Sequence, residues 1–203
     1  MLQKTIKAYI ENQINHHPQN QSIGIYKEEK EYAEAHGIVP EQIKLVEEKA
    51  LSRFKDAYIE RVDKETEELI SAENPSKFLQ EKVNFLKANQ KEFVYLESDW
   101  FDMIKIDGLT LEHDDVFGTY KGLLGLKQKK AAGSSIRKWF NEKANGETTK
   151  FQLLFNDKDG LWDLNFDCDL IDGFHGDMTL NKAFEMIYSF LFELINDLES
   201  IEQ

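Results

Sequence analysis

The segment 162–170 constrains the fold most strongly, because its apolar and polar residues alternate without a break. Trp, Leu, Phe, Cys and Leu occupy the even positions, and the odd positions hold Asp163, Asn165, Asp167 and Asp169. Successive side chains of a strand point to opposite faces of its sheet, so the pattern predicts a strand with one buried and one acidic face. An apolar run at 151–155 and an Asp-Lys-Asp-Gly turn sequence precede it, which predicts a β-hairpin over about 150–170.

The C-terminal region predicts one helix, from Leu180 to about Leu198, with Thr179 as its N-terminal cap. Its apolar side chains cover nearly the whole circumference: Met186, Ile187, Tyr188, Phe190, Leu191, Phe192, Leu194 and Ile195. A helix on the surface of a domain has a single apolar stripe. We therefore expect a buried helix that closes the fold.

The region 1–92 has the apolar spacing of helices. Two short helices are predicted first, the second ending at Gly37. From Ile43 to Ile70, apolar residues recur at steps of three, four or seven, which predicts one long amphipathic helix over about 41–73. After Phe93 we expect strands at 93–96 and 103–106 and an irregular, glycine-rich and lysine-rich segment at 121–132.

The predicted fold is therefore α+β, with N-terminal helices followed by a small antiparallel sheet and a closing buried C-terminal helix. The chain divides into a helical region at 1–92 and an α+β region at 93–203, or it forms a single integrated domain. The sequence does not choose between these two arrangements.

The charge balance restricts the partners of the chain. The sequence has 25 Lys and Arg against 38 Asp and Glu, a net charge of −13, which discourages direct contact with nucleic acid or an anionic membrane. Cys168 is the single cysteine, no signal peptide is recognisable, and the longest apolar stretch is too short to cross a bilayer. We expect a cytoplasmic protein.

Acidic residues concentrate toward the C-terminus. Residues 157–203 contain twelve acidic and two basic side chains, a net charge of −10, whereas residues 121–143 contain seven basic and one acidic, a net charge of +6. An acidic strand face suits a basic protein partner. The residues predicted to bind that partner are Asp157, Asp159, Asp163, Asp167 and Asp169.

The function that this pattern favours is an acidic binding protein, as in inhibitors or toxin-immunity proteins, with no cofactor, metal or catalytic residue assigned. One alternative is a metal-dependent hydrolase that uses Asp163, Asp167 and His175. Another is a helical scaffold or oligomer in which the helices predicted at 41–73 pair between subunits. Cys168 lies on the apolar side of its strand between two aspartates, which makes it a core residue rather than a nucleophile.

Overall fold

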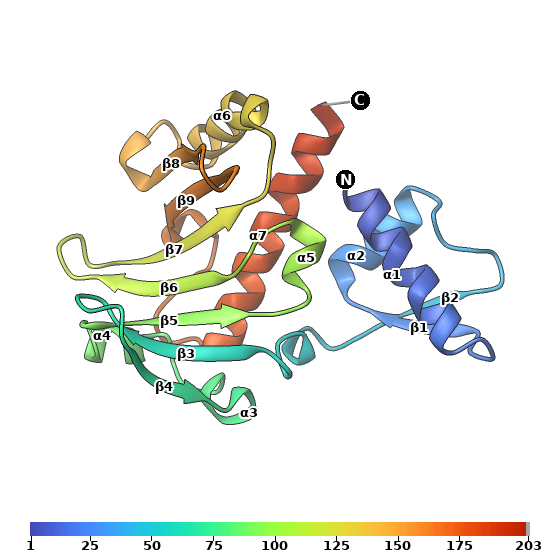
Figure 1. The fold of residues 1–203 in the computed structure, drawn as a ribbon, viewed down its shortest axis with the longest axis horizontal. Helices are drawn as coiled ribbons and strands as arrows, with labels where there is room; N and C mark the ends of the chain where they lie inside the picture. The colour runs from blue at the N-terminus through green and yellow to red at the C-terminus, as the bar shows by residue number, and fades with distance from the viewer. Residues whose placement is uncertain (202–203) are drawn as a thin grey trace.

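The computed structural model describes residues 1–201 and shows a seven-stranded antiparallel sheet, a long C-terminal helix against it, and a smaller N-terminal unit at its side (Figure 1). The α+β prediction is confirmed, although the sheet is larger than expected. Its strand order is β4-β3-β5-β6-β7-β9-β8. The strands are β3 (Tyr58–Asp63), β4 (Leu69–Glu73), β5 (Glu92–Glu97), β6 (Leu109–Asp114), β7 (Thr119–Leu126), β8 (Phe151–Asn156) and β9 (Leu161–Asp167).

The N-terminal unit consists of α1 (Leu2–His16), β1 (Ser22–Ile25), α2 (Lys27–Ala35) and β2 (Lys44–Glu47). Strands β1 and β2 form a separate two-stranded parallel sheet. The two predicted short helices are confirmed as α1 and α2. Gly37 follows α2 with a φ of 60°, the left-handed conformation that glycine adopts at helix ends.

The hairpin and the closing helix are also confirmed. Strands β8 and β9 pair across the predicted turn, and Gly160 ends that turn with a φ of 70°. Helix α7 runs over Leu180–Ile201, and its Lys182 amide donates to Oγ1 of Thr179 at 3.2 Å. The other helices are α3 (Pro75–Phe78), α4 (Asn84–Ala88), α5 (Phe101–Ile104) and α6 (Gly133–Lys143).

The predicted long helix over 41–73 is wrong, because this segment forms β2, the short 3-10 turn η1 (Ala50–Ser52), β3 and β4. The helical spacing included Tyr58, which is 48% exposed, and left out Ile59, which is fully buried. Strand β3 pairs with β5 on one side and with β4 on the other. A division of the chain at 92/93 would therefore cut through the sheet.

Two shorter predictions in the second half are also wrong. The expected strand at 103–106 overlaps helix α5, which ends at Ile104 and is followed by Lys105 with a φ of 59°. The expected irregular segment at 121–132 begins inside β7, which runs to Leu126 and lies between β6 and β9. Gly122 is needed there because a Cβ atom would lie 2.9 Å from the Phe166 ring, so this glycine marks close packing within a strand rather than a loop.

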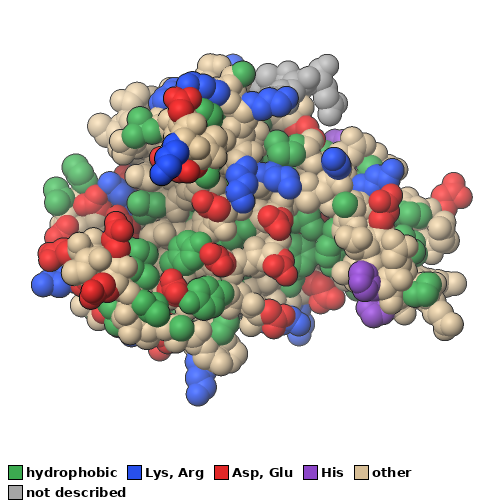
Figure 2. Space-filling view, viewed as in Figure 1, with side chains coloured by type: hydrophobic (Ala, Val, Ile, Leu, Met, Phe, Trp, Pro, Cys, Tyr) green, Lys and Arg blue, Asp and Glu red, His purple; other side chains and the backbone are tan. Residues whose placement is uncertain are grey.

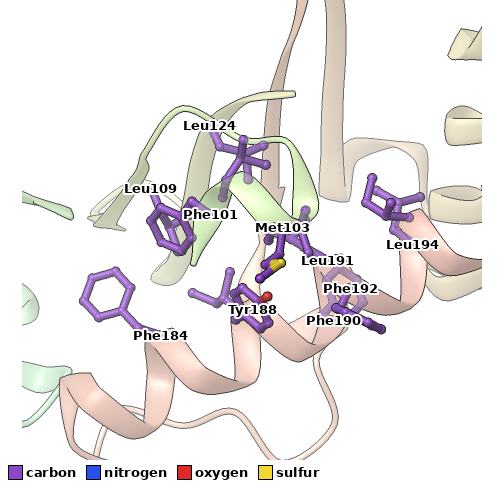
Figure 3. Packing of buried hydrophobic residues seen from close by; sticks show 14 of the residues in the cluster. Phe101, Met103, Leu109, Leu124, Phe184, Tyr188, Phe190, Leu191, Phe192 and Leu194 are labelled. Atoms are coloured by element: carbon purple, nitrogen blue, oxygen red, sulfur yellow. The ribbon is translucent and has the colours of Figure 1, made fainter. Parts of the chain in front are cut away.

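Helix α7 packs against one face of the sheet and forms the centre of the core. Figure 3 shows Phe184, Tyr188 and Leu191 of α7 facing Phe101 and Met103 of α5. Phe184, Tyr188 and Leu191 have no exposed surface. The apolar circumference of α7 is thus explained by burial in the core, as predicted.

Candidate functional site: an acidic sheet face and the cleft beside it

The face of the sheet opposite α7 is open to solvent. Residues directly opposite one another in neighbouring strands share a face, and one such row crosses six strands: Glu60, Tyr95, Thr110, Leu123, Asn165 and Gln152. Its members are half-buried or exposed, whereas Ile59, Val94, Leu111 and Phe166, which point to the other face, are buried. We call this surface the open face.

The open face is acidic. The register places six carboxylates on it, and Lys121 is the one basic residue among its strand positions in the described chain; the carboxylates are Glu60, Glu97, Glu112, Asp114, Asp163 and Asp167. Figure 2 shows acidic side chains spread across the middle of the molecule with tan and green surface between them. This acidic region lies where the open face borders the N-terminal unit.

Two of the predicted partner-binding residues lie on this face. Asp163 is exposed and lies between Gly125 of β7 and Leu154 of β8. Asp167 is half-buried, 3.4 Å from Oγ1 of Thr119 and 4.0 Å from Nζ of Lys121, and burial raises its pKa above the ordinary value.

The other three predicted residues lie elsewhere. Strand β9 ends at Asp167, so Asp169 falls in the 3-10 turn η4 (Cys168–Leu170) and pairs with Lys150 at 3.1 Å. Asp157 and Asp159 lie at the hairpin tip. Asp157 pairs with Lys130 at 2.6 Å, and Asp159 accepts a hydrogen bond from Nδ2 of Asn156 at 2.8 Å. Lys130 of the basic segment 121–143, and Lys150 beyond it, therefore neutralise part of the acidic surface.

A cleft of about 770 Å³ lies between the N-terminal unit and the edge of the open face. Tyr9, Tyr26 and Trp100 form its aromatic wall. Six carboxylates line it: Glu48, Asp56, Glu97, Asp99, Asp102 and Asp107. The basic residues in its lining are Arg53, Lys55 and Lys127. Glu97 belongs to both surfaces, so the acidic open face continues into the cleft.

The position of Asp107 depends on a glycine in β7. Oδ1 of Asp107 accepts hydrogen bonds from the amides of Gly108 at 2.8 Å and Gly125 at 3.0 Å. A Cβ atom on Gly125 would lie 2.5 Å from Oδ2 of Asp107, so a larger residue would displace this carboxylate. Gly125 thus helps to hold an acidic group at the junction of the two surfaces.

Arg53 lies buried behind the cleft, where it binds three carboxylates. Its guanidinium donates to Glu29 at 2.7 Å, Glu28 at 2.6 Å and Glu185 at 3.3 Å. It also stacks on the rings of Tyr188 and Tyr26, with 3.9 and 4.2 Å from Cζ to the centroids. Burial alone would lower the pKa of Arg53, but Tyr188 and the carboxylates raise it above its ordinary value.

The carboxylates of this cluster are only partly satisfied. Oε2 of Glu29 and Oε1 of Glu185 are buried and have no hydrogen-bond partner. Burial raises the pKa of Glu185 to about 7, with the charges of Glu28 and Glu29 acting in the same direction against Arg53. This cluster was not predicted. A signal for it exists, since Arg53 is one of only three arginines in a lysine-rich chain and arginine is the cation suited to buried ion pairs.

The alternative metal site does not assemble. Among residues 1–201 there is no group of three or more His, Cys, Asp and Glu side chains that could hold a metal ion. Asp163 and Asp167 are four residues apart on one strand, which separates them by about 13 Å. Cys168 is fully buried, and burial raises the pKa of its thiol, so its predicted place in the core is confirmed.

Comparisons with protein-family models, with curated proteins and with solved structures find no match to this chain. In the part of the chain that the structure describes, no helix is long and apolar enough to cross a membrane.

Proposed function

We propose that this chain is an acidic binding protein that engages a basic protein partner through the open face and the adjoining cleft. The observation that carries the proposal is the continuity of carboxylates from Asp163 on β9, through Asp107, to Glu97 and the cleft. A sheet face of this width that lacks a covering layer offers a broad surface to another protein.

The chemistry of the surface supports a protein partner rather than a nucleic acid. Nucleic-acid phosphates would be repelled by six strand carboxylates, whereas lysines and arginines of a partner would be attracted. Tyrosines lie among these acids: the hydroxyl of the half-buried Tyr95 donates to Glu97 at 2.7 Å, and that of the exposed Tyr58 donates to Glu60. Tyrosine is enriched where proteins bind one another.

An inhibitory role follows if the partner uses its basic surface to bind phosphates. The carboxylates of the open face would then occupy the positions of phosphate groups and compete with the nucleic acid. This is the arrangement expected of an immunity-type protein, and we place the complex in the cytoplasm. The two alternatives have less support. Among the described residues no group of three or more His, Cys, Asp and Glu side chains could hold a metal ion, and residues 41–73 form strands and a 3-10 turn instead of one helix.

A comparison of two charge variants tests the proposal. The open-face variant carries Glu60→Gln, Glu97→Gln and Asp163→Asn. The control variant carries Glu11→Gln, Glu31→Gln and Glu34→Gln, three exposed carboxylates of α1 and α2. Each variant removes three negative charges, so nonspecific attraction falls equally in both. The proteins are immobilised, exposed to lysate of the native host, and washed with rising salt.

We expect a basic protein to remain on the wild-type and control columns at low salt and to be lost from the open-face column. With the isolated partner, the affinity of the open-face variant should fall by about tenfold or more and depend less on salt. Retention of the same proteins on all three columns would refute the proposed function.

A further inference from the structure

The cleft between the N-terminal unit and the sheet is large enough to hold part of a partner chain. Its volume of about 770 Å³ is within the range of about 300–1,000 Å³ that is usual for binding pockets. Figure 2 shows apolar surface between the N-terminal unit and the sheet, with acidic side chains beside it. The open face is broad, whereas the cleft is bounded by two parts of the molecule, so the two surfaces suit different parts of a partner.

The charges of the cleft favour a cationic occupant. Six carboxylates and three basic side chains line it, which gives a net charge of −3 when all are ionised. One of the basic side chains, Arg53, is already bound by three carboxylates outside the lining. All six acidic residues are exposed, and within residues 1–201 the one ion pair they make is that of Asp56 with Lys55 at 3.8 Å. A cation of the partner would therefore meet accessible carboxylates that are largely unpaired.

The wall of the cleft also offers a hydrogen-bond donor, the indole N–H of Trp100. The indole of Trp139 donates to Asp197 at 2.9 Å, and that of Trp162 donates to the backbone oxygen of Lys129 at 3.3 Å. In the described part of the chain, Nε1 of Trp100 has no acceptor, and it is not one of the buried atoms that lack a partner. Solvent or a ligand can therefore reach this donor, which matches a carbonyl oxygen.

Gln13 adds a second polar group that matches a peptide. Its half-buried side chain lines the cleft, and its amide makes no hydrogen bond to the rest of the described chain. A peptide bond has both the acceptor and the donor that such an amide can pair with. A linear polyamine would satisfy the carboxylates of the cleft, but it has no acceptor for Trp100 or Gln13. The lining therefore favours a basic peptide over a simple organic cation.

We propose that the cleft holds an extended, arginine-containing segment of the basic partner. The guanidinium group binds the carboxylates that flank Trp100 in the segment 97–102, and a backbone carbonyl of the partner accepts from Nε1 of Trp100; these carboxylates are Glu97, Asp99 and Asp102. Arginine fits better than lysine because its planar group has five donors and packs on aromatic rings. This assignment rests on the proposed function, and it leaves the open face to the folded surface of the partner.

The test uses the full chain with a pentapeptide that has arginine in the centre, alanine at the other positions and both ends blocked. A peptide with citrulline in place of arginine is its neutral counterpart, and butylguanidinium supplies the cation without a peptide carbonyl. At low ionic strength we expect a dissociation constant of about 1 mM for the arginine peptide, about tenfold weaker binding of the citrulline peptide and about fivefold weaker binding of butylguanidinium.

The indole N–H signals of the three tryptophans report the place of binding. The signal of Trp100, assigned by its absence in Trp100→Phe, should shift as the arginine peptide is added. The signals of Trp139 and Trp162 should stay in place, because their N–H groups already donate within the protein.

Two pairs of charge changes test the role of the carboxylates. The cleft variant carries Asp99→Asn and Asp102→Asn, and it should bind the arginine peptide about fivefold more weakly with no change for the citrulline peptide. The matched control carries Glu31→Gln and Glu34→Gln, which remove the same charge from exposed positions of α2 and should have little effect. Glu97 is left unchanged because it also belongs to the open face.

Trp100→Phe tests the role of the indole donor, since it keeps an aromatic ring and removes the N–H. Binding is then followed through the backbone amide of Ser98, which also lines the cleft. The affinity for the arginine peptide should fall about fivefold, and that for butylguanidinium should not change.

The assignment of the cleft would be overturned by an unchanged Trp100 signal at about 10 mM arginine peptide. Equal affinity for the arginine and citrulline peptides, or for the arginine peptide and butylguanidinium, would overturn it as well. These results are separate from the column test of the proposed function. If the open-face variant loses the partner and the peptide does not bind, the assignment of the cleft alone fails. If the peptide binds and all columns retain the same proteins, the proposed function fails.

Discussion

At the scale of single residues, Arg53 has the largest structural consequence. Its side chain has no exposed surface, and it joins α2 and α7, which are more than a hundred residues apart in the chain. Glu29 receives a second hydrogen bond from the hydroxyl of Tyr188. A buried cluster of this kind contributes little net stability compared with apolar packing, but it is costly to disrupt on one side.

Replacement of Arg53 by Met should therefore destabilise the fold strongly. The variant keeps an unbranched side chain but leaves three buried carboxylates uncompensated, and we expect a loss of about 3–5 kcal/mol in the free energy of unfolding. Urea denaturation followed by tryptophan fluorescence measures it. The matched control is Arg61→Met, whose partly exposed pairs with Glu92 and Glu73 should contribute about 1 kcal/mol or less. Equal losses in both variants would contradict this account of Arg53.

Glu185 should make stability depend on pH in the neutral range. The carboxyl titrates near the ordinary value of 4.5 when unfolded and at about 7 when folded, so the folded state holds a proton that the unfolded state has released. Stability from this group is therefore present below pH 4.5 and is lost as the pH rises to 7. The loss amounts to about 3 kcal/mol.

The Glu185→Gln variant lacks this titration. Urea melts between pH 5 and 8 should show wild type losing stability relative to the variant as the pH rises. Parallel curves for the two proteins would show that Glu185 titrates near its ordinary pKa.

At the scale of elements, the same kind of apolar spacing had two different outcomes. In α7 nearly every side of the helix is apolar. A strand of that length would not require apolar residues at all these positions, and the helix forms as predicted. In β3 the residues alternate too briefly to be recognised, and the three- and four-residue steps through Tyr58 and Val62 imitate a helix. Pairing with β4 and β5 decides in favour of the strand, since packing against neighbours overrides weak local preference.

The buried position of α7 predicts the effect of shortening its side chains. Leu191 has no exposed surface, and Leu191→Ala should reduce the free energy of unfolding by about 2–5 kcal/mol, because it removes buried methyl groups and leaves a cavity. Glu193→Ala, two residues along on the exposed side, provides the comparison and should cost less than about 1 kcal/mol. Denaturant melts at pH 7 measure both, and a Leu191→Ala protein as stable as wild type would place this side chain outside the core.

At the scale of the whole molecule, the sheet unites the two halves of the chain. Strand β3 from the first half lies beside β5 from the second, paired over six residue positions. The N-terminal unit contacts α5 and α7, and the Arg53 cluster lies where these parts meet. We therefore expect the halves to fold together.

Separation of the chain at 92/93 tests this expectation. The fragment 93–203 would expose the edge of β5 and the surfaces of α5 and α7 that contact the N-terminal unit. It should not reach a folded state, and its amide NMR spectrum should lack the dispersion of the full chain. A well-dispersed spectrum with cooperative melting would show instead that the second half is an independent domain.

The sequence determined those elements whose pattern of apolar and polar residues is complete within one segment. The alternation at 162–170 and the turn before it specify the β8–β9 hairpin, and the all-round apolar surface of 180–198 specifies a buried helix. Asp163 and Asp167 could be assigned to a solvent-facing surface for the same reason, since the period of a strand fixes which side chains share a face.

The tertiary structure alone decided which distant residues meet. It placed β3 and β7 inside the sheet, brought Glu60, Glu97 and Asp163 onto one face, and moved Asp169 off that face by ending β9 at Asp167. It also assembled Arg53 with acids from α2 and α7. The physical reason is that strand pairing and buried ion pairs are formed between segments far apart in the chain. The stabilising energy of these long-range contacts therefore cannot be inferred from the residue pattern of a single segment.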